Sequence, residues 1–108
     1  MVKSRINVDI LKSIERYINE IKKYYSIDYV ILFGSYASGT NNEDSDIDVA
    51  IISKDIKNSF EDGVKLMSLT WHIDTRIEPH AINTEAFNIV DTPFIDEIIK
   101  TGVELYAA

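Results

Sequence analysis

Two aspartates, Asp46 and Asp48, are the residues of this 108-residue chain whose type and spacing best suit chemistry. They open the run DIDVAII, which predicts a β-strand over residues 46–52. Residues two apart in a strand point to the same side, so the two carboxylates project together and the apolar residues between them face the other way. Carboxylates about 4 Å apart repel by about 1 kcal/mol in water and about 4 kcal/mol at an effective dielectric of 20. Folding gains nothing from this pair, whereas Mg²⁺ would convert the repulsion into a binding site.

A glycine–serine turn before this pair could hold phosphates. The segment YVILF, residues 29–33, is short, apolar and β-branched, which predicts a buried strand ending at Gly34. Gly34 permits a tight turn because it has no Cβ, Ser35 offers a hydroxyl, and amides at the start of a following helical turn can hold an anion. A metal on one strand and phosphates on the adjacent turn would place a nucleotide between them.

Turn formation and calcium binding are alternative interpretations of the acidic segment. Asx-rich loops often form turns and caps, so a lone Asp-x-Asp pair is weak evidence for catalysis. The alternation of Asn42, Asp44, Asp46 and Asp48 would also suit calcium. The glycine that an EF-hand loop requires is missing, however, and a strand rather than a helix is expected to follow. The combination of the aspartate pair with the Gly-Ser turn favours the nucleotide site.

The elements expected around this site form a small mixed β-sheet with helices packed on it, an α/β or α+β fold in a single domain, residues 1–108. Apolar residues recur at helical spacing from Ile10 to Tyr25 and predict an amphipathic helix, with Asn7 or Asp9 as its cap. A weaker helix is expected further along the chain. Its apolar stripe consists of Phe60, Val64, Met67 and Trp71, of which Met67 and Trp71 are interpreted as core.

The C-terminal third is expected to add a strand, a helix and a last strand. TRIEPHAI, residues 75–82, predicts a third strand at an edge or bulge, because Pro79 cannot donate a ladder hydrogen bond. TPFIDEIIKTG predicts a short helix with Thr92 as cap, Pro93 in the first turn and Gly102 at the stop. VELYA predicts the final strand.

Composition narrows the classes of function. The formal net charge is −7, which disfavours direct nucleic-acid binding, because phosphate neutralisation supplies most of that affinity. No apolar run approaches the roughly 20 residues needed to span a membrane, and the N-terminal MVKSRINVDI lacks the apolar stretch of a signal peptide. The chain has no cysteine, so it has neither disulfides nor thiolate metal sites. A cytoplasmic protein is expected.

The stretch GSYASGTNNEDSDIDVAI, residues 34–51, resembles the signature of the DNA polymerase beta-type nucleotidyltransferase superfamily. In that signature Gly-Ser, a spacer and an Asp-x-Asp flanked by apolar residues follow one another. The chain is similar in length to members of the minimal nucleotidyltransferase branch, and its expected order of elements matches the family's core along nearly all of its length. The resemblance implies a DNA polymerase beta-like core and a nucleotide-transferring enzyme.

The resemblance also implies roles for the residues already singled out. Gly34 and Ser35 would bind the triphosphate of ATP, the nucleotide substrate. Asp46 and Asp48 would be catalytic and would hold two Mg²⁺ ions. One ion would activate the attacking hydroxyl, and both would stabilise the in-line transition state at the α-phosphate.

The family has a third carboxylate on a neighbouring strand, and two residues could supply it. Glu78 lies within the expected third strand, on the side shared with Arg76 and His80, whereas Asp74 lies at the strand's beginning. We favour Glu78 as the third catalytic and metal-binding carboxylate, with Asp74 as the alternative. Arg76 and His80 could touch phosphate or the acceptor, or could be ordinary polar residues on a half-exposed strand.

A protein partner is a further implication of the resemblance. Companions of the minimal branch are helical proteins of the higher-eukaryote-and-prokaryote nucleotide-binding (HEPN) class, and such pairs behave as toxin and antitoxin. The companion is a ribonuclease, which the nucleotidyltransferase neutralises by attaching AMP from ATP to a tyrosine. We therefore expect a hetero-oligomer with a HEPN-domain toxin, in which this chain is a protein adenylyltransferase and the antitoxin of a type VII toxin–antitoxin pair.

Two other functions stay open from the sequence. The chain could be a non-catalytic binding module that neutralises its partner by complex formation, with a site that is vestigial or only binds nucleotide. It could instead modify a small molecule or a nucleic-acid end with the help of a separate substrate-binding subunit. AMP transfer to the partner, dependent on Asp46 and Asp48, distinguishes the leading hypothesis from both.

Overall fold

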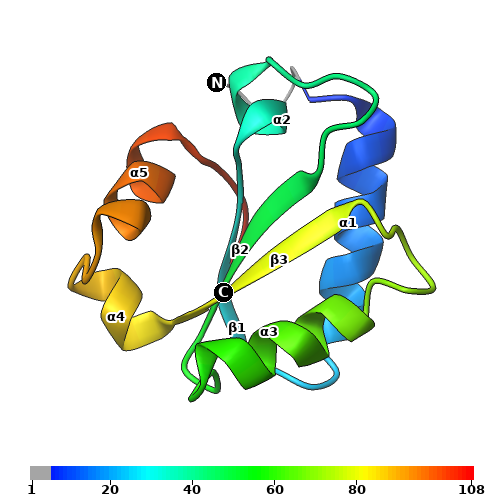
Figure 1. Ribbon diagram of the computed structural model, residues 1–108. Helices are drawn as coiled ribbons and strands as arrows, with labels where there is room; N and C mark the ends of the chain where they lie inside the picture. The colour runs from blue at the N-terminus through cyan, green and yellow to red at the C-terminus, as the bar shows by residue number, and fades with distance from the viewer. Residues whose placement is uncertain (1–5) are drawn as a thin grey trace.

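The structure, a computed structural model, describes residues 6–108 (Figure 1). Residues 1–5 include part of the N-terminal segment in which no signal peptide was expected, and they lie outside the described residues. In residues 6–108 no helix is both long enough and apolar enough to cross a membrane. The elements in chain order are α1 (Val8–Ile21), β1 (Ile27–Phe33), α2 (Ser35–Ser38), β2 (Ile47–Ser53), α3 (Ser59–Ser68), β3 (Ile77–Asn83), α4 (Thr84–Asn88), α5 (Pro93–Thr101) and β4 (Val103–Ala107).

The four strands form one mixed sheet in the order β3-β2-β1-β4. Strand β1 is antiparallel to both β2 and β4, whereas β2 and β3 are parallel and are joined by the crossover helix α3. Pro79 lies in β3 at the edge of the sheet, where its missing N–H costs no ladder hydrogen bond. The mixed sheet with packed helices confirms the expected fold class.

Helices cover both faces of the sheet (Figure 1). Helices α1 and α3 pack on one face, where Val49 and Ile51 of β2 join an isoleucine-rich core. Helices α4 and α5 cover the other face, to which Ala50 and Ile52 point. This alternation places the side chain of Asp48 on the α4–α5 side, because residues two apart in a strand share a face.

Several predicted helix ends are confirmed. Asn7 caps α1, accepting a hydrogen bond from the backbone N–H of Asp9. Thr92 caps α5 in the same way, Pro93 is its first residue and Gly102 follows its last. Helix α1 ends at Ile21, earlier than its apolar periodicity predicted. The short helix α4 was not predicted, because its five residues are too few to establish a helical period.

The interpretation of Met67 and Trp71 as core was wrong. All four apolar side chains of their stripe are exposed: Phe60 79%, Val64 57%, Met67 39% and Trp71 73%. A different side of the helix faces the sheet, through Leu66, which is fully buried, and the following Leu69 and Ile73, which are partly buried. The hydroxyl of Tyr17 on α1 donates to the Leu66 carbonyl over 2.7 Å, which fixes this orientation. Two apolar stripes have helical spacing on this segment, and local sequence alone does not distinguish the buried one.

Candidate active site

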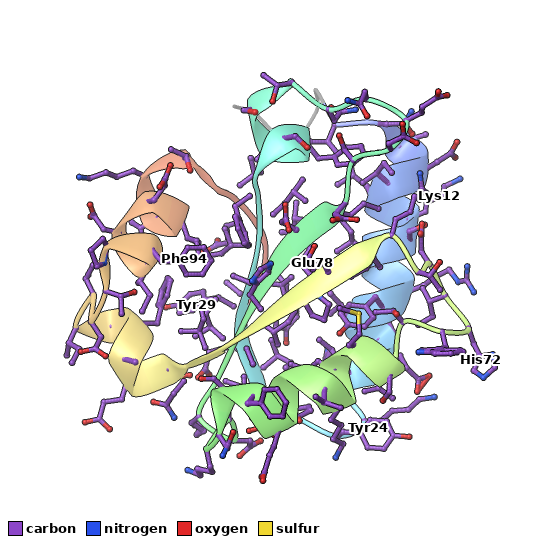
Figure 2. The ribbon with its side chains drawn as sticks, in the orientation of Figure 1. Lys12, Tyr24, Tyr29, His72, Glu78 and Phe94 are labelled. Atoms are coloured by element: carbon purple, nitrogen blue, oxygen red, sulfur yellow. The ribbon has the colours of Figure 1, made fainter. Side chains whose placement is uncertain are left out.

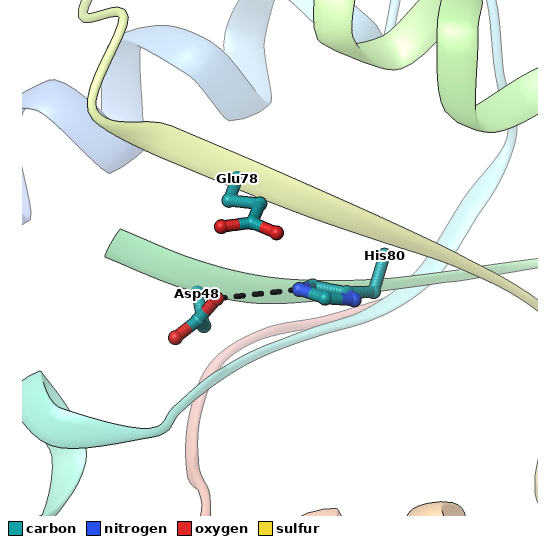
Figure 3. A group of neighbouring side chains, drawn as sticks. All are labelled: Asp48, Glu78 and His80. Atoms are coloured by element: carbon teal, nitrogen blue, oxygen red, sulfur yellow. Dashed lines mark hydrogen bonds and ion pairs between the residues drawn. The ribbon is translucent and has the colours of Figure 1, made fainter. Parts of the chain in front are cut away.

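Strand register brings the acidic residues together. In the parallel pair of β2 and β3, Asp48 lies opposite Glu78, and Ala50 lies opposite His80. Asp48, Glu78 and His80 therefore point to the same face of the sheet, and one ligand atom from each lies within 4.8 Å of the other two (Figure 3). Asp46, which was expected to open the strand, lies in the loop immediately before β2.

The carboxylates of this cluster repel one another. The pKa of Glu78 is raised above its ordinary value by its hydrogen bond with Asp46, by burial and by the negative charge of Asp48. The Nε2 atom of His80 lies 3.3 Å from Oδ1 of Asp48 and is the nearby group that can offset this charge. Such a crowded set of hard oxygen donors fits Mg²⁺, whose binding would remove the repulsion.

The Gly-Ser turn lies directly against Asp48. Gly34 follows Phe33, which pairs with Asp48 across β1 and β2. The φ and ψ angles of Gly34 are 74° and −152°, a conformation that is nearly restricted to glycine. A Cβ at this position would lie 2.5 Å from Oδ2 of Asp48. Because β2 lies between β1 and β3, the Asp48 carboxylate stands between the Gly34 backbone on one side and Glu78 on the other.

Asp74 and Arg76 bind each other rather than joining the carboxylate cluster. The Arg76 Nε and Nη2 atoms donate to the two carboxylate oxygens of Asp74 over 3.0 Å and 2.7 Å. These hydrogen bonds lower the pKa of Asp74 to about 2. Strand β3 begins at Ile77, so Arg76 precedes the strand on which it was expected to share a face with Glu78. Glu78, rather than Asp74, is the carboxylate that lies beside Asp48.

Aromatic residues border the cluster on the side of α5. The Phe33 ring lies 5.0 Å from the His80 ring and 5.5 Å from the Phe94 ring, in edge-to-face contacts. Phe94 projects from the start of α5 toward the sheet (Figure 2). Phe33 and Phe94 were not among the residues expected at the site. The signal available for Phe33 was its position directly before the Gly-Ser turn.

Comparison with known proteins identifies the family of the chain. A family model described as "Polymerase beta, Nucleotidyltransferase" matches residues 15–108. The chain belongs to this family. The resemblance inferred from residues 34–51 is confirmed, and the protein is a nucleotidyltransferase.

Relatives of this nucleotidyltransferase share most of its length. A protein of Methanocaldococcus jannaschii named "Putative protein adenylyltransferase MJ0141" is 32% identical over 98 residues, which are 91% of this chain and 97% of that protein. The crystal structure of "a putative nucleotidyltransferase from Sulfolobus solfataricus" has a TM-score of 0.69 at 23% identity, covering 93% of this chain and 82% of that one. A crystal structure of "the toxin-antitoxin with AMP-PNP" has a TM-score of 0.60 at 20% identity, covering 91% and 73%. The two structures show that the fold is shared.

Proposed function

We propose that this nucleotidyltransferase is a protein adenylyltransferase that transfers AMP from ATP to a tyrosine of a HEPN-class toxin and acts as the antitoxin of a type VII pair. The observation that carries the proposal is the position of Asp48, between the Gly34 turn and Glu78. A phosphate-holding turn on one side of a carboxylate cluster is the arrangement that nucleotide transfer needs. The name of the Methanocaldococcus relative supports a protein as acceptor.

The reaction exchanges one bond at the α-phosphorus of ATP. The tyrosine oxygen forms a bond to the α-phosphorus, the bond from that phosphorus to the oxygen bridging to the β-phosphate breaks, and pyrophosphate leaves. The hydroxyl proton is released to water. The products are an AMP-tyrosine phosphodiester and pyrophosphate, so the transfer needs neither an oxidant nor a reductant.

Each residue of the site has a defined task in this proposal. The Gly34–Ser35 turn holds the phosphates that depart as pyrophosphate. Asp46, Asp48 and Glu78 would hold Mg²⁺, which when bound lowers the pKa of the attacking hydroxyl and neutralises charge that develops on the phosphates. His80 contacts Oδ1 of Asp48 and so orients that carboxylate, leaving Oδ2 beside Gly34.

The test is transfer of labelled AMP to a candidate HEPN-class partner, sought in the reading frames adjacent to the gene for this chain. The two purified proteins are mixed with Mg²⁺ and α-labelled ATP, and the modified residue is located by mass spectrometry. We expect label on a tyrosine of the partner, abolished by Asp46→Asn or Asp48→Asn and by chelation of the metal. Absence of label in the wild-type reaction refutes the proposed transfer.

A neutralisation assay separates catalysis from simple masking. The double variant Asp46→Asn/Asp48→Asn keeps the size and shape of both side chains, so a complex that relies only on surface contact still forms. We expect this variant to leave the partner's ribonuclease activity intact. Full neutralisation by the double variant would instead establish a non-catalytic binding module. Label on a nucleic-acid end or a small molecule would indicate a different acceptor.

A further inference from the structure

An exposed apolar stripe runs along α3 and the turn that follows it. It consists of Phe60, Val64, Met67 and Trp71, and we call it the α3 stripe. Phe60 and Trp71 expose 79% and 73% of their surface, which is unusual for two large aromatic residues so close together on one small protein. Clustered exposed apolar side chains mark interaction sites more often than single ones do. The stripe therefore needs an explanation other than packing within this chain.

The stripe is continuous with the candidate active site. It lines an open groove of about 530 Å³ together with Glu78, Pro79 and His80 of the edge strand β3. Glu78 and His80 also belong to the metal-binding cluster with Asp48. A molecule that lies in this groove thus reaches from the α3 stripe to the carboxylates of the site.

The direction of the reaction assigns this groove to the acceptor. In an in-line transfer the attacking hydroxyl and the departing pyrophosphate lie on opposite sides of the α-phosphorus. Gly34, which is placed to hold the departing phosphates, lies on one side of Asp48, and Glu78 lies on the other. The hydroxyl therefore approaches from the side of β3 and α3, along the groove that the stripe borders.

The spacing of the stripe specifies a helix as its occupant. The three members that lie within α3, Phe60, Val64 and Met67, are separated by four and three positions, which is the spacing of a seam against which a second helix packs. Phe60, Gly63, Val64 and Met67 stand at i, i+3, i+4 and i+7, the four positions that surround one hole in knobs-into-holes packing. A Cβ built on Gly63 would meet nothing within 4 Å, so this hole is open to a side chain from outside.

We infer that the α3 stripe is the docking surface for an α-helix of the protein acceptor, which inserts a side chain over Gly63 and brings the acceptor hydroxyl to Glu78. This inference rests on the proposed function, because it concerns the acceptor of that same site. The carboxylates at this end of the groove repel acidic groups, so the acceptor carries basic or uncharged side chains next to its hydroxyl.

Two substitutions test the surface without touching the catalytic residues. Trp71→Ala removes the largest exposed side chain of the stripe. Gly63→Leu fills the open hole while replacing a glycine inside a helix with a better helix former, so the isolated protein stays folded. We expect each to weaken binding of the HEPN-class partner at least 30-fold, which corresponds to about 2 kcal/mol. Isothermal titration calorimetry measures the affinity, and thermal unfolding of each isolated variant verifies its fold.

Ile89→Ala is the matched control. Ile89 is also large, apolar and 67% exposed, but it follows α4 and does not line the groove. We expect its truncation to leave the partner's affinity unchanged. In the AMP-transfer assay the two stripe variants should raise KM for the partner by the same factor as Kd, with little change in kcat or in KM for ATP.

The outcomes distinguish this inference from the proposed function. Stripe variants that bind the partner as tightly as the wild type overturn the inference, even if AMP is transferred normally. A stripe-dependent complex without AMP transfer supports the docking surface and refutes the catalytic proposal. Weakened binding of an ATP analogue to Trp71→Ala would show that Trp71 stacks on the nucleobase and would overturn the inference. Sedimentation analysis could instead show that the wild type is a dimer and that Gly63→Leu is a monomer. That result would overturn the inference, because the occupant of the stripe would be a second copy of this chain.

Discussion

Replacing Gly34 by alanine should lower both the stability of the protein and its affinity for Mg²⁺, for two different structural reasons. At φ 74° and ψ −152° an alanine is strained by about 1–3 kcal/mol. The added Cβ would also lie 2.5 Å from Oδ2 of Asp48, closer than real contacts allow. The carboxylate can turn away and relieve this contact, so the larger part of the stability loss comes from the backbone. This rotation of the Asp48 carboxylate would displace a metal ligand.

The size of the effect follows from these two contributions. For a domain of about 100 residues, 1 kcal/mol shifts Tm by roughly 5 °C, so Gly34→Ala should lower Tm by roughly 5–15 °C. Displacement of Asp48 should weaken Mg²⁺ binding about 10–100-fold, the range found when the support of a metal ligand is altered. The first quantity is measured by thermal unfolding followed by circular dichroism, and the second by titration of the isolated protein with Mg²⁺.

Gly63→Ala is the control for the stability measurement. Gly63 lies within α3 and a Cβ there meets nothing within 4 Å, so alanine should raise the free energy of unfolding by about 0.5–1 kcal/mol and leave Mg²⁺ affinity unchanged. A Gly34→Ala protein with wild-type Tm and wild-type Mg²⁺ affinity would refute the argument. Loss of stability with unchanged metal binding would show that Oδ2 of Asp48 is not a ligand.

Three further predictions concern the carboxylates. Asp48→Asn should lower AMP transfer below detection. It should change Tm by less than about 3 °C, because Asp48 is only partly buried. A folded variant that still transfers AMP would contradict the role assigned to Asp48. Mg²⁺ at ten times its Kd should raise the free energy of unfolding of the wild type by about 1.4 kcal/mol and should leave that of Asp48→Asn unchanged. Thermal unfolding of both proteins at increasing Mg²⁺ concentration measures this difference. The pKa of Asp74 is lowered to about 2, so its ionised carboxylate stabilises the folded protein at every pH above the ordinary pKa near 4. This stabilisation is lost as the pH falls from about 4 toward 2. Asp74→Asn should therefore cost about 1 kcal/mol at pH 7, a value reduced because Arg76 is half exposed, and only a small fraction of that at pH 2 in urea unfolding.

The strands and most helix ends could be predicted because local sequence determines them. Alternation from Ile47 to Ile52 correctly indicated which side chains share a face, and Pro79 correctly indicated an edge strand. The cap, first turn and stop of α5 follow from Thr92, Pro93 and Gly102, which act through bonds within a few residues. Such signals need no knowledge of the rest of the fold.

The exposed side of α3 could not be predicted, because it depends on which other element covers the helix. Both the α3 stripe and the set of Leu66, Leu69 and Ile73 have helical spacing, and only tertiary packing selects the second set for the core. The ion pair of Asp74 with Arg76 also lay beyond sequence analysis, which could compare Asp74 and Glu78 only by position. The register of β2 and β3, which puts Glu78 opposite Asp48, is a long-range property.

The pairing of β2 with β3 restricts how the chain can vary in length. Buried side chains on both faces of β2 fix its register, so deletion of one residue within Val49–Ser53 would turn Asp48 into the α1 core and bring Ile47 into the place of a ligand. The loop of residues 40–45 is exposed or half-buried and is stabilised by local hydrogen bonds such as that from Asp44 to Asn42. Insertions should therefore be tolerated in this loop and excluded from the strand that follows it, a contrast that a library of single-residue insertions and deletions would reveal.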